Sequence, residues 1–186
     1  RTWLATSDTS YDVIVSQPTN PWVSGVANLF TQEFHALVRS RLKEGGIACQ
    51  WVQLYQSDPW MLRSQVRSFL EGFPHAQAWF GGDGDLLLVG SMQPLRVEAE
   101  PARAAFAANA SFRRFGAQLS AKTADELLAR FVTDREKLLA WAREGGEVLS
   151  DRRPRLESRA VRNLLARTSH APLMSDLLAL RDLESP

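Results

Sequence analysis

One stretch of the sequence decides the fold class, because it joins a buried-strand pattern to an abrupt polar ending: Tyr11-Asp12-Val13-Ile14-Val15-Ser16-Gln17-Pro18-Thr19-Asn20-Pro21-Trp22. The three β-branched residues Val13–Val15 are typical of a parallel strand that is covered on both faces. Pro18 and Pro21 lack a backbone N–H, so the strand cannot continue through them. We therefore expect the side chains of Gln17 and Asn20 at the carboxyl end of a strand, which is where open α/β sheets bind ligands.

Strands and helices alternate after this stretch. Apolar residues at helical spacing predict a helix over residues 31–43, which Gly45-Gly46 would end, and Ile47–Leu54 predicts a second buried strand. By the right-handed crossover rule, we expect residues 11–16 and 47–54 to form neighbouring parallel strands. The helix residues that we expect to pack against these strands are Phe34, Leu37 and Val38.

A second helix and a hairpin follow. Asp58-Pro59 is a helix start, in which an N-cap residue precedes a proline at the first helical position. Residues 76–80 and 85–89 flank Gly81-Gly82-Asp83-Gly84, which predicts a four-residue hairpin connection. Parallel strand–helix units that are closed by an antiparallel hairpin predict an α/β domain over residues 1–93.

Residues 94–186 have a different composition, rich in Ala, Leu, Arg and Glu, and predict helices with no further strand. Thr123-Ala124-Asp125-Glu126 is a capping box before a helix that includes Phe131. Asp134 can cap the next helix, and Pro172–Leu183 predicts the last one. We therefore expect a helical C-terminal extension behind the α/β domain.

The length, net charge, apolar runs and cysteine count of the sequence exclude several classes of protein. A length of 186 residues suffices for one domain with a small extension, and a net charge of +1 gives no electrostatic reason to expect a nucleic-acid partner. No apolar run approaches the roughly 20 residues that span a bilayer. Cys49 is the single cysteine, which excludes an internal disulfide, and we expect it to be a buried thiol. No metal-site spacing and no GxGxxG loop occur, so we expect no metal and no tightly bound cofactor.

Residues 11–31 and Gly45–Trp51 resemble the spermidine synthase family, and more closely its spermidine-synthase-like branch that is often fused behind membrane helices. The similarity extends from Arg1 to about Ser91, and a weaker echo occurs at Ser150–Glu157. The resemblance implies the C-terminal half of a Rossmann-like S-adenosylmethionine-dependent methyltransferase fold plus a helical tail. It also implies transfer of an aminopropyl group from decarboxylated S-adenosylmethionine, bound as a cosubstrate, to a polyamine.

The resemblance also implies that this domain belongs to a longer protein. The family's glycine loop and nucleotide-binding acidic residues would precede Arg1, so we expect a C-terminal fragment that shows no aminopropyl transfer by itself. The branch implies a cytoplasmic domain that is tethered to the inner membrane in the full-length protein. Half of a parallel sheet would leave an unpaired edge strand, which favours homodimerisation or aggregation.

Four residues are expected to cluster around a concave surface at one end of the sheet: Gln17, Asn20, Trp22 and Gln50. By the resemblance, Gln17 stands where the family has its catalytic Asp, and Asn20 stands where it has a second Asp. Both are neutral amides, which can hydrogen-bond an amine but cannot accept its proton or balance its charge. Gln50 matches a Gln near the family's substrate pocket, and Trp22 either walls the pocket or packs in the core. Weaker candidates at the same edge are Gln53 and Tyr55.

Three functions stay open at this point. The amides at positions 17 and 20 favour a non-catalytic ligand-binding or regulatory domain that retains the fold, whereas the loop framework and Gln50 favour the aminopropyltransferase. The third is another S-adenosylmethionine-dependent transferase. The basic cluster Arg152-Arg153-Pro154-Arg155 is interpreted as a solvated, salt-bridged surface, against the alternative of a contact with an anionic ligand or a membrane surface.

Overall fold

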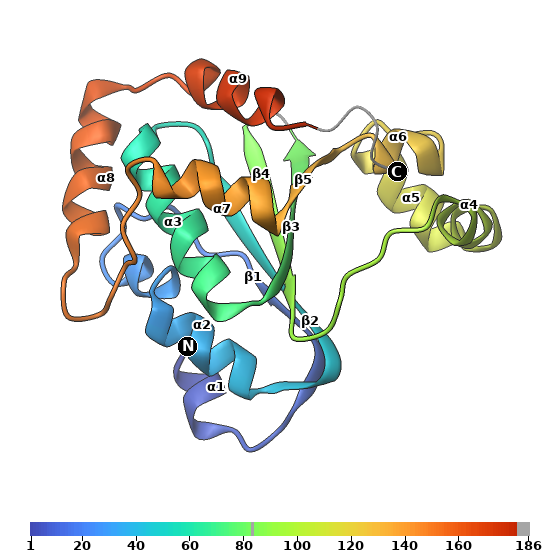
Figure 1. Ribbon diagram of the computed structural model, residues 1–186, viewed down its shortest axis with the longest axis horizontal. Coiled ribbons are helices and arrows are strands. Elements are labelled where there is room, and N and C mark those ends of the chain that lie inside the picture. The colour runs from blue at the N-terminus through green and yellow to red at the C-terminus, as the bar shows by residue number, and fades with distance from the viewer. Residues whose placement is uncertain (83, 182–186) are drawn as a thin grey trace.

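The chain has an α/β fold built on one mixed sheet of five strands, in the order β1-β2-β4-β3-β5 (Figure 1). The computed structural model describes residues 1–82 and 84–181. β1 and β2 are parallel, and the other neighbouring strands of the sheet are antiparallel. The strands are β1 (Tyr11–Ser16), β2 (Leu42–Gln53), β3 (His75–Gly82), β4 (Asp85–Ser91) and β5 (Phe131–Asp134).

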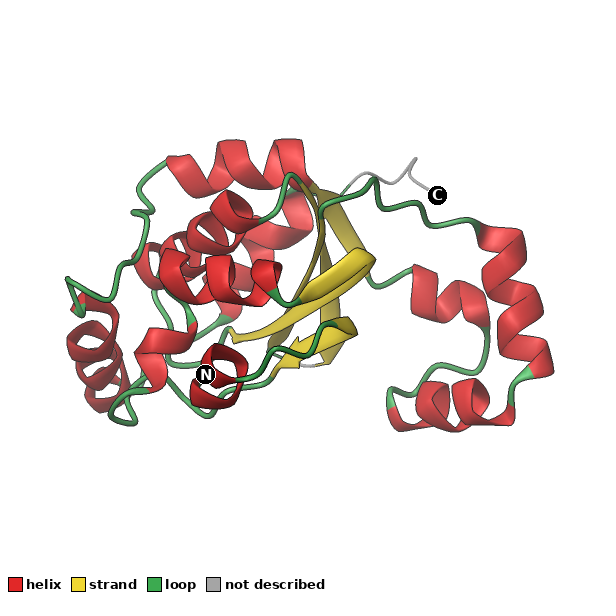
Figure 2. Ribbon diagram, turned by 90° about the horizontal axis from the view of Figure 1, so that it is seen from below, coloured by secondary structure: helices red, strands yellow, loops and turns green. Residues whose placement is uncertain are grey.

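Helices lie on both sides of the sheet, but they are distributed unequally (Figure 2). One face is covered closely by a helical layer, whereas α4, α5 and α6 stand apart beyond the other face (Figures 1 and 2). The helices are α1 (Thr2–Thr6), η1 (Val26–Leu29), α2 (Gln32–Ser40), α3 (Pro59–Gly72), α4 (Ala99–Ala108), α5 (Ala110–Gln118), α6 (Ala124–Leu128), α7 (Arg135–Arg143), α8 (Arg155–Ala166) and α9 (Ala171–Ala179).

Helix α3 is the centre of the covered face. Its predicted start is confirmed, because the Asp58 carboxylate accepts a hydrogen bond from the Met61 N–H at 3.0 Å. Phe69 and Phe73 are buried against the sheet, with ring centroids 4.8 Å apart. A Cβ atom at Gly90 of β4 would lie 2.6 Å from the Phe73 ring, so glycine at this position permits the close approach of α3 to the sheet.

The predicted parallel pair is confirmed, with Ile14 of β1 opposite Ala48 of β2. Phe34 and Val38 of α2 are buried in the same core, and Leu37 is half-buried. The expectation that β1 is covered on both faces is wrong. Val13 and Val15 are 55% and 64% exposed, because β1 is an edge strand and the close helical layer covers one face only.

The predicted boundary between α2 and β2 is shifted. α2 ends at Ser40 and β2 begins at Leu42, so Gly45-Gly46 lies inside the strand and does not end the helix. The register with β1 is irregular there, because Tyr11 lies opposite Leu42 and Val13 lies opposite Ile47. Gly45 has φ +71°, a left-handed conformation that suits glycine in such a bulge.

The predicted hairpin is confirmed, since β3 and β4 pair antiparallel. Gly81 and Gly82 belong to β3 itself, so the connection is shorter than the four residues expected. Asp83, which the prediction placed in the turn, lies outside the described residues.

The expectation that no strand follows residue 94 is wrong. Phe131, which was expected in a helix, begins β5, and Thr133 of β5 lies opposite Ala78 of β3. The helix start at Thr123 is confirmed, since its hydroxyl accepts the Glu126 N–H at 3.2 Å. The last helix, α9, ends at Ala179, and the end of the predicted range lies outside the described residues. The chain therefore returns to the sheet after α6, and α7, α8 and α9 add buried residues to the main core.

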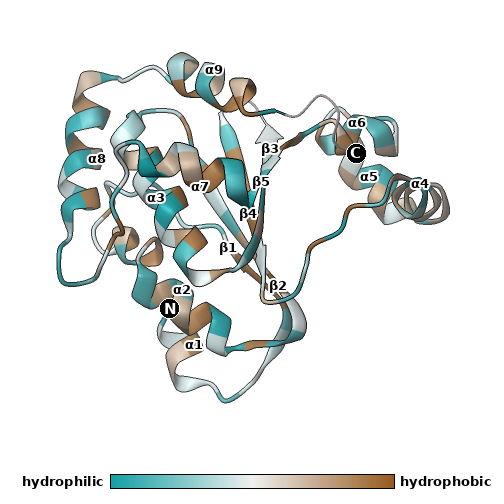
Figure 3. Ribbon diagram, viewed as in Figure 1, coloured by the Kyte–Doolittle hydropathy of each residue, from teal (hydrophilic) through white to brown (hydrophobic). Residues whose placement is uncertain are grey.

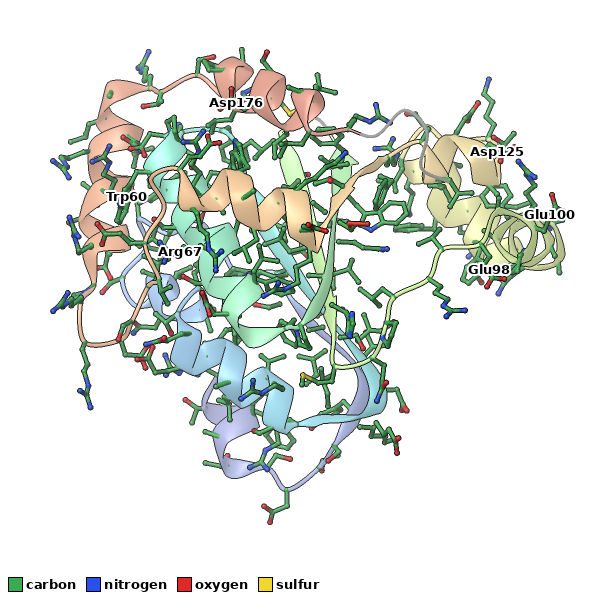
Figure 4. The ribbon with its side chains drawn as sticks, viewed as in Figure 1. Trp60, Arg67, Glu98, Glu100, Asp125 and Asp176 are labelled. Carbon is green, nitrogen blue, oxygen red and sulfur yellow. The ribbon has the colours of Figure 1, made fainter. Side chains whose placement is uncertain are left out.

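Helix α8, which the sequence did not predict, is held on α3 by polar contacts. Asp58 accepts hydrogen bonds from Arg159 Nε at 2.6 Å and Asn163 Nδ2 at 2.7 Å. The guanidinium groups of Arg155 and Arg159 lie over the Trp60 ring, 5.4 and 5.5 Å from its centroid (Figure 4 labels Trp60 at this junction). Figure 3 shows many hydrophilic residues along α8. Of the basic cluster, Arg155 forms an ion pair, with Glu147 at 2.5 Å.

Candidate functional site

A cavity of about 240 Å³ lies at the carboxyl ends of β1 and β2, on the open face of the sheet. Two of its walls come from the region that stands apart in Figure 2, namely Phe115 of α5 and Leu119 just after it. The strands supply the remaining walls. The lining residues are Val15, Gln17, Cys49, Trp51, Gly81, Asp85, Leu87, Phe115 and Leu119.

Strand alternation explains which side chains reach this cavity. Successive residues of a strand point to opposite faces, so Ala48 and Gln50 of β2 are buried under the helices, whereas Cys49 and Trp51 point to the open face. On β1, Val15 lies opposite Cys49 and shares that open face. The floor of the cavity is therefore apolar and comes from adjacent strands.

Asp85 brings a carboxylate to this site. It is the first residue of β4 and lies opposite Gln53 of β2 and Gly82 of β3, which places it at the same end of the sheet as Gln17. The residue is half-buried. Within residues 1–82 and 84–181, no hydrogen bond or ion pair occupies the Asp85 carboxylate.

Tyr55 joins the loop after β1 to the end of β2. Its hydroxyl donates a hydrogen bond to Asn20 Oδ1 at 3.0 Å, and its ring centroid lies 6.5 Å from that of Trp51. Burial raises the pKa of the Tyr55 hydroxyl, and the negative charge of Asp85 raises it further, so the hydroxyl stays protonated at neutral pH. Asn20 therefore lies beside the cavity with its side-chain oxygen already bonded.

The structure does not bring the four expected residues together. Gln17 lines the cavity, and Asn20 is connected to its rim through Tyr55. Gln50 is only 2% exposed and belongs to the helix-covered face, where its Nε2 donates to the Trp51 carbonyl at 3.0 Å. Trp22 is half-buried and packs against the hydrophobic core.

Sequence reasoning missed Asp85 and the walls from α5 as parts of the site. The position of Asp85 could have been inferred, because it follows a predicted hairpin whose register fixes its neighbours. No sequence signal places Phe115, because its position depends on the path of the irregular segment between β4 and α4.

Cys49 is half-buried where a buried thiol was expected. Burial raises its pKa, which keeps the thiol protonated and poorly nucleophilic at neutral pH. The described residues contain no group of three or more His, Cys, Asp or Glu side chains that could hold a metal ion. Over the same part of the chain, no helix combines the length and the apolar character needed to cross a membrane.

No protein-family model matches this chain, and no curated protein matches it either. Support for a function therefore comes from the geometry of the cavity and from the sequence resemblance.

Proposed function

We propose that this chain is the amine-binding part of a spermidine-synthase-like aminopropyltransferase domain, with the strand order of the C-terminal half of a Rossmann-like methyltransferase fold. The observation that carries the proposal is that Gln17 lines a cavity at the carboxyl ends of two parallel strands. The cosubstrate would be decarboxylated S-adenosylmethionine, and the acceptor would be a polyamine.

The chemistry of the cavity supports an alkyl amine as the ligand. Val15, Leu87 and Phe115 offer apolar surface for methylene groups. Trp51 offers an aromatic ring for an ammonium group. The amide oxygen of Gln17 can accept a hydrogen bond from the same group.

A second candidate function is a non-catalytic amine-binding domain. An alkyl amine is protonated at pH 7 and must lose a proton before it can attack carbon. Neither Gln17 nor Asn20 can take that proton, and the side-chain oxygen of Asn20 is already bonded to Tyr55. This observation favours binding without rapid turnover.

The test is the mass-spectrometric detection of spermidine formed from putrescine and decarboxylated S-adenosylmethionine. The assay uses the longest natural form of the protein that carries this chain. The double variant Gln17→Asp/Asn20→Asp should raise turnover, because general-base help is worth about 10²–10⁴-fold. Asn109→Asp is the matched control, since an Asp at this N-cap of α5 can accept the same Ser111 N–H that Asn109 accepts at 2.9 Å.

The outcomes separate the two candidate functions. Faster spermidine formation by the double variant, with an unchanged control, supports a transferase that has a weakened catalytic loop. Turnover that the double variant leaves unchanged would show that the base lies outside the loop after β1. No turnover in either protein, with retained amine binding, would support the non-catalytic domain.

A further inference from the structure

We propose that Asp85 is the residue that binds the cationic end of the amine, so that the carboxylate of this site comes from the β3–β4 hairpin and not from the loop after β1. The inference rests on the proposed function, and it names the group that gives the cavity its charge selectivity. The ligand class is a primary alkyl amine with a short methylene chain, including one end of a diamine or polyamine.

The β3–β4 hairpin places Asp85 at the cavity. Asp85 lines the same cavity of about 240 Å³ as Gln17 and Trp51. A cavity of this size is slightly smaller than a typical small-molecule site, so it suits one end of an alkyl amine better than a nucleotide. Tyr55 lies close enough to Asp85 that the negative charge adds to the effect of burial, which raises the pKa of the Tyr55 hydroxyl.

Several aspartates of the fold are neutralised by a cationic side chain. For example, Asp12 pairs with Lys43 at 2.8 Å, and Asp58 pairs with Arg159 at 2.6 Å. Across the described parts of the chain, no cation pairs with Asp85, although it is half-buried. A half-buried carboxylate without a counter-charge gains most from a cationic ligand, because partial desolvation strengthens the attraction.

Most of the lining around Asp85 is apolar. An ammonium group bound by Asp85 can contact the Trp51 ring, which adds a cation–π attraction. The methylene chain would then lie over Val15 and Leu87, and Phe115 would cover it from the opposite side. A metal ion would gain less from such an apolar floor, which favours an organic cation such as an alkyl ammonium group.

Gly81 keeps this arrangement open. A Cβ atom at Gly81 would lie 3.2 Å from the Asp85 Cβ and 3.4 Å from the Leu87 Cγ. A methyl group here would therefore press on the two side chains that form the charged end and the floor of the cavity. We expect Gly81→Ala to weaken amine binding while leaving the charge of the site unchanged.

The experiment is isothermal titration of the 186-residue protein with spermidine at low ionic strength, where charge pairs are least screened. Asp85→Asn preserves shape and removes the charge, so we expect spermidine affinity to fall about 10- to 100-fold. Asp12→Asn is the matched control, because Asp12 lies at the amino end of β1, away from the cavity. The spermidine affinity of this variant should stay within about twofold of wild type. Added NaCl should weaken binding by the wild-type protein more than binding by Asp85→Asn.

Each result has a defined meaning. No spermidine binding by the folded wild-type protein would contradict the proposed function and this inference together. Wild-type binding that Asp85→Asn leaves unchanged would contradict the inference alone and leave the proposed function standing. If circular dichroism shows that Asp85→Asn fails to fold, Gly81→Ala and the salt dependence of wild-type binding decide the question. Wild-type affinity in Gly81→Ala together with salt-independent binding would then overturn the inference.

Discussion

The two faces of the sheet differ in how they are covered, although the same strands form both. On the covered face, Ala48, Val52 and Leu88 are buried beneath the helices. On the open face, Val15 is 64% exposed and Trp51 is only half-buried. One face of this molecule therefore supplies most of the buried core, whereas the other face has unfilled space for a ligand.

Single-residue alternation separates the two roles along one strand. Gln50 and Trp51 are neighbours in β2, yet Gln50 is buried in the covered face and Trp51 lines the cavity. Polar groups at the carboxyl end of a strand therefore do not all belong to one site. The face to which each side chain points decides whether it can meet a ligand.

The largest expected difference between the two faces is in the free energy of unfolding that is lost when a buried or an exposed phenylalanine is truncated. Phe69 is 1% exposed under the sheet, so Phe69→Ala should lower the free energy of unfolding by about 3–5 kcal/mol. Phe115 on the open side is 53% exposed, and Phe115→Ala should lower it by no more than about 0.5 kcal/mol. Urea unfolding of both variants measures the two values. Equal losses would show that α5 is as important to the core as α3.

The second prediction uses pH to probe the covered face. Burial lowers the pKa of His35 from 6.5 to about 4, and a hydrogen bond between Nδ1 and the Ser68 carbonyl opposes this only partly. Below pH 6.5 the unfolded chain binds a proton that the folded chain does not, so stability should fall between pH 6.5 and 4 by about 3 kcal/mol. Denaturant unfolding as a function of pH measures this loss.

A variant isolates the contribution of this histidine. His35→Asn removes the titrating group, so its stability should depend less on pH between 6.5 and 4 than that of wild type. If His35→Asn retains the full slope, another group causes the acid sensitivity.

The third prediction concerns the contact between α3 and α8. Asp58→Ala removes an N-cap hydrogen bond and the contacts with Arg159 and Asn163, so it should cost about 2 kcal/mol of unfolding free energy. Asp134 is an N-cap residue without a side-chain capping bond, so Asp134→Ala should cost less than about 0.5 kcal/mol. Thermal unfolding compares the two variants, and similar losses would contradict a stabilising contact of Asp58 with Arg159 and Asn163.

Local signals explain what the sequence could predict. The strand at residues 11–16 and the helix start at Asp58-Pro59 depend on nearby residues, and both appear in the structure. β5 has only four residues, and Phe131 also fits the apolar spacing of the helix before it, so only pairing with β3 makes it a strand. The site was harder to predict, because Asp85, Trp51 and Phe115 meet only after three distant segments have packed.

An NMR titration with spermidine, in which Val and Leu methyl groups and Trp indole N–H groups are observed, tests most directly whether the amine binds in this cavity. We expect shifts for Val15, Leu87 and Trp51 on the open face, and no shift for Val38 or Leu62 in the covered core. In Asp85→Asn the same open-face shifts should require about 10- to 100-fold more spermidine. Shifts confined to other surfaces, or an unchanged titration of Asp85→Asn, would contradict the assignment of the amine to this cavity.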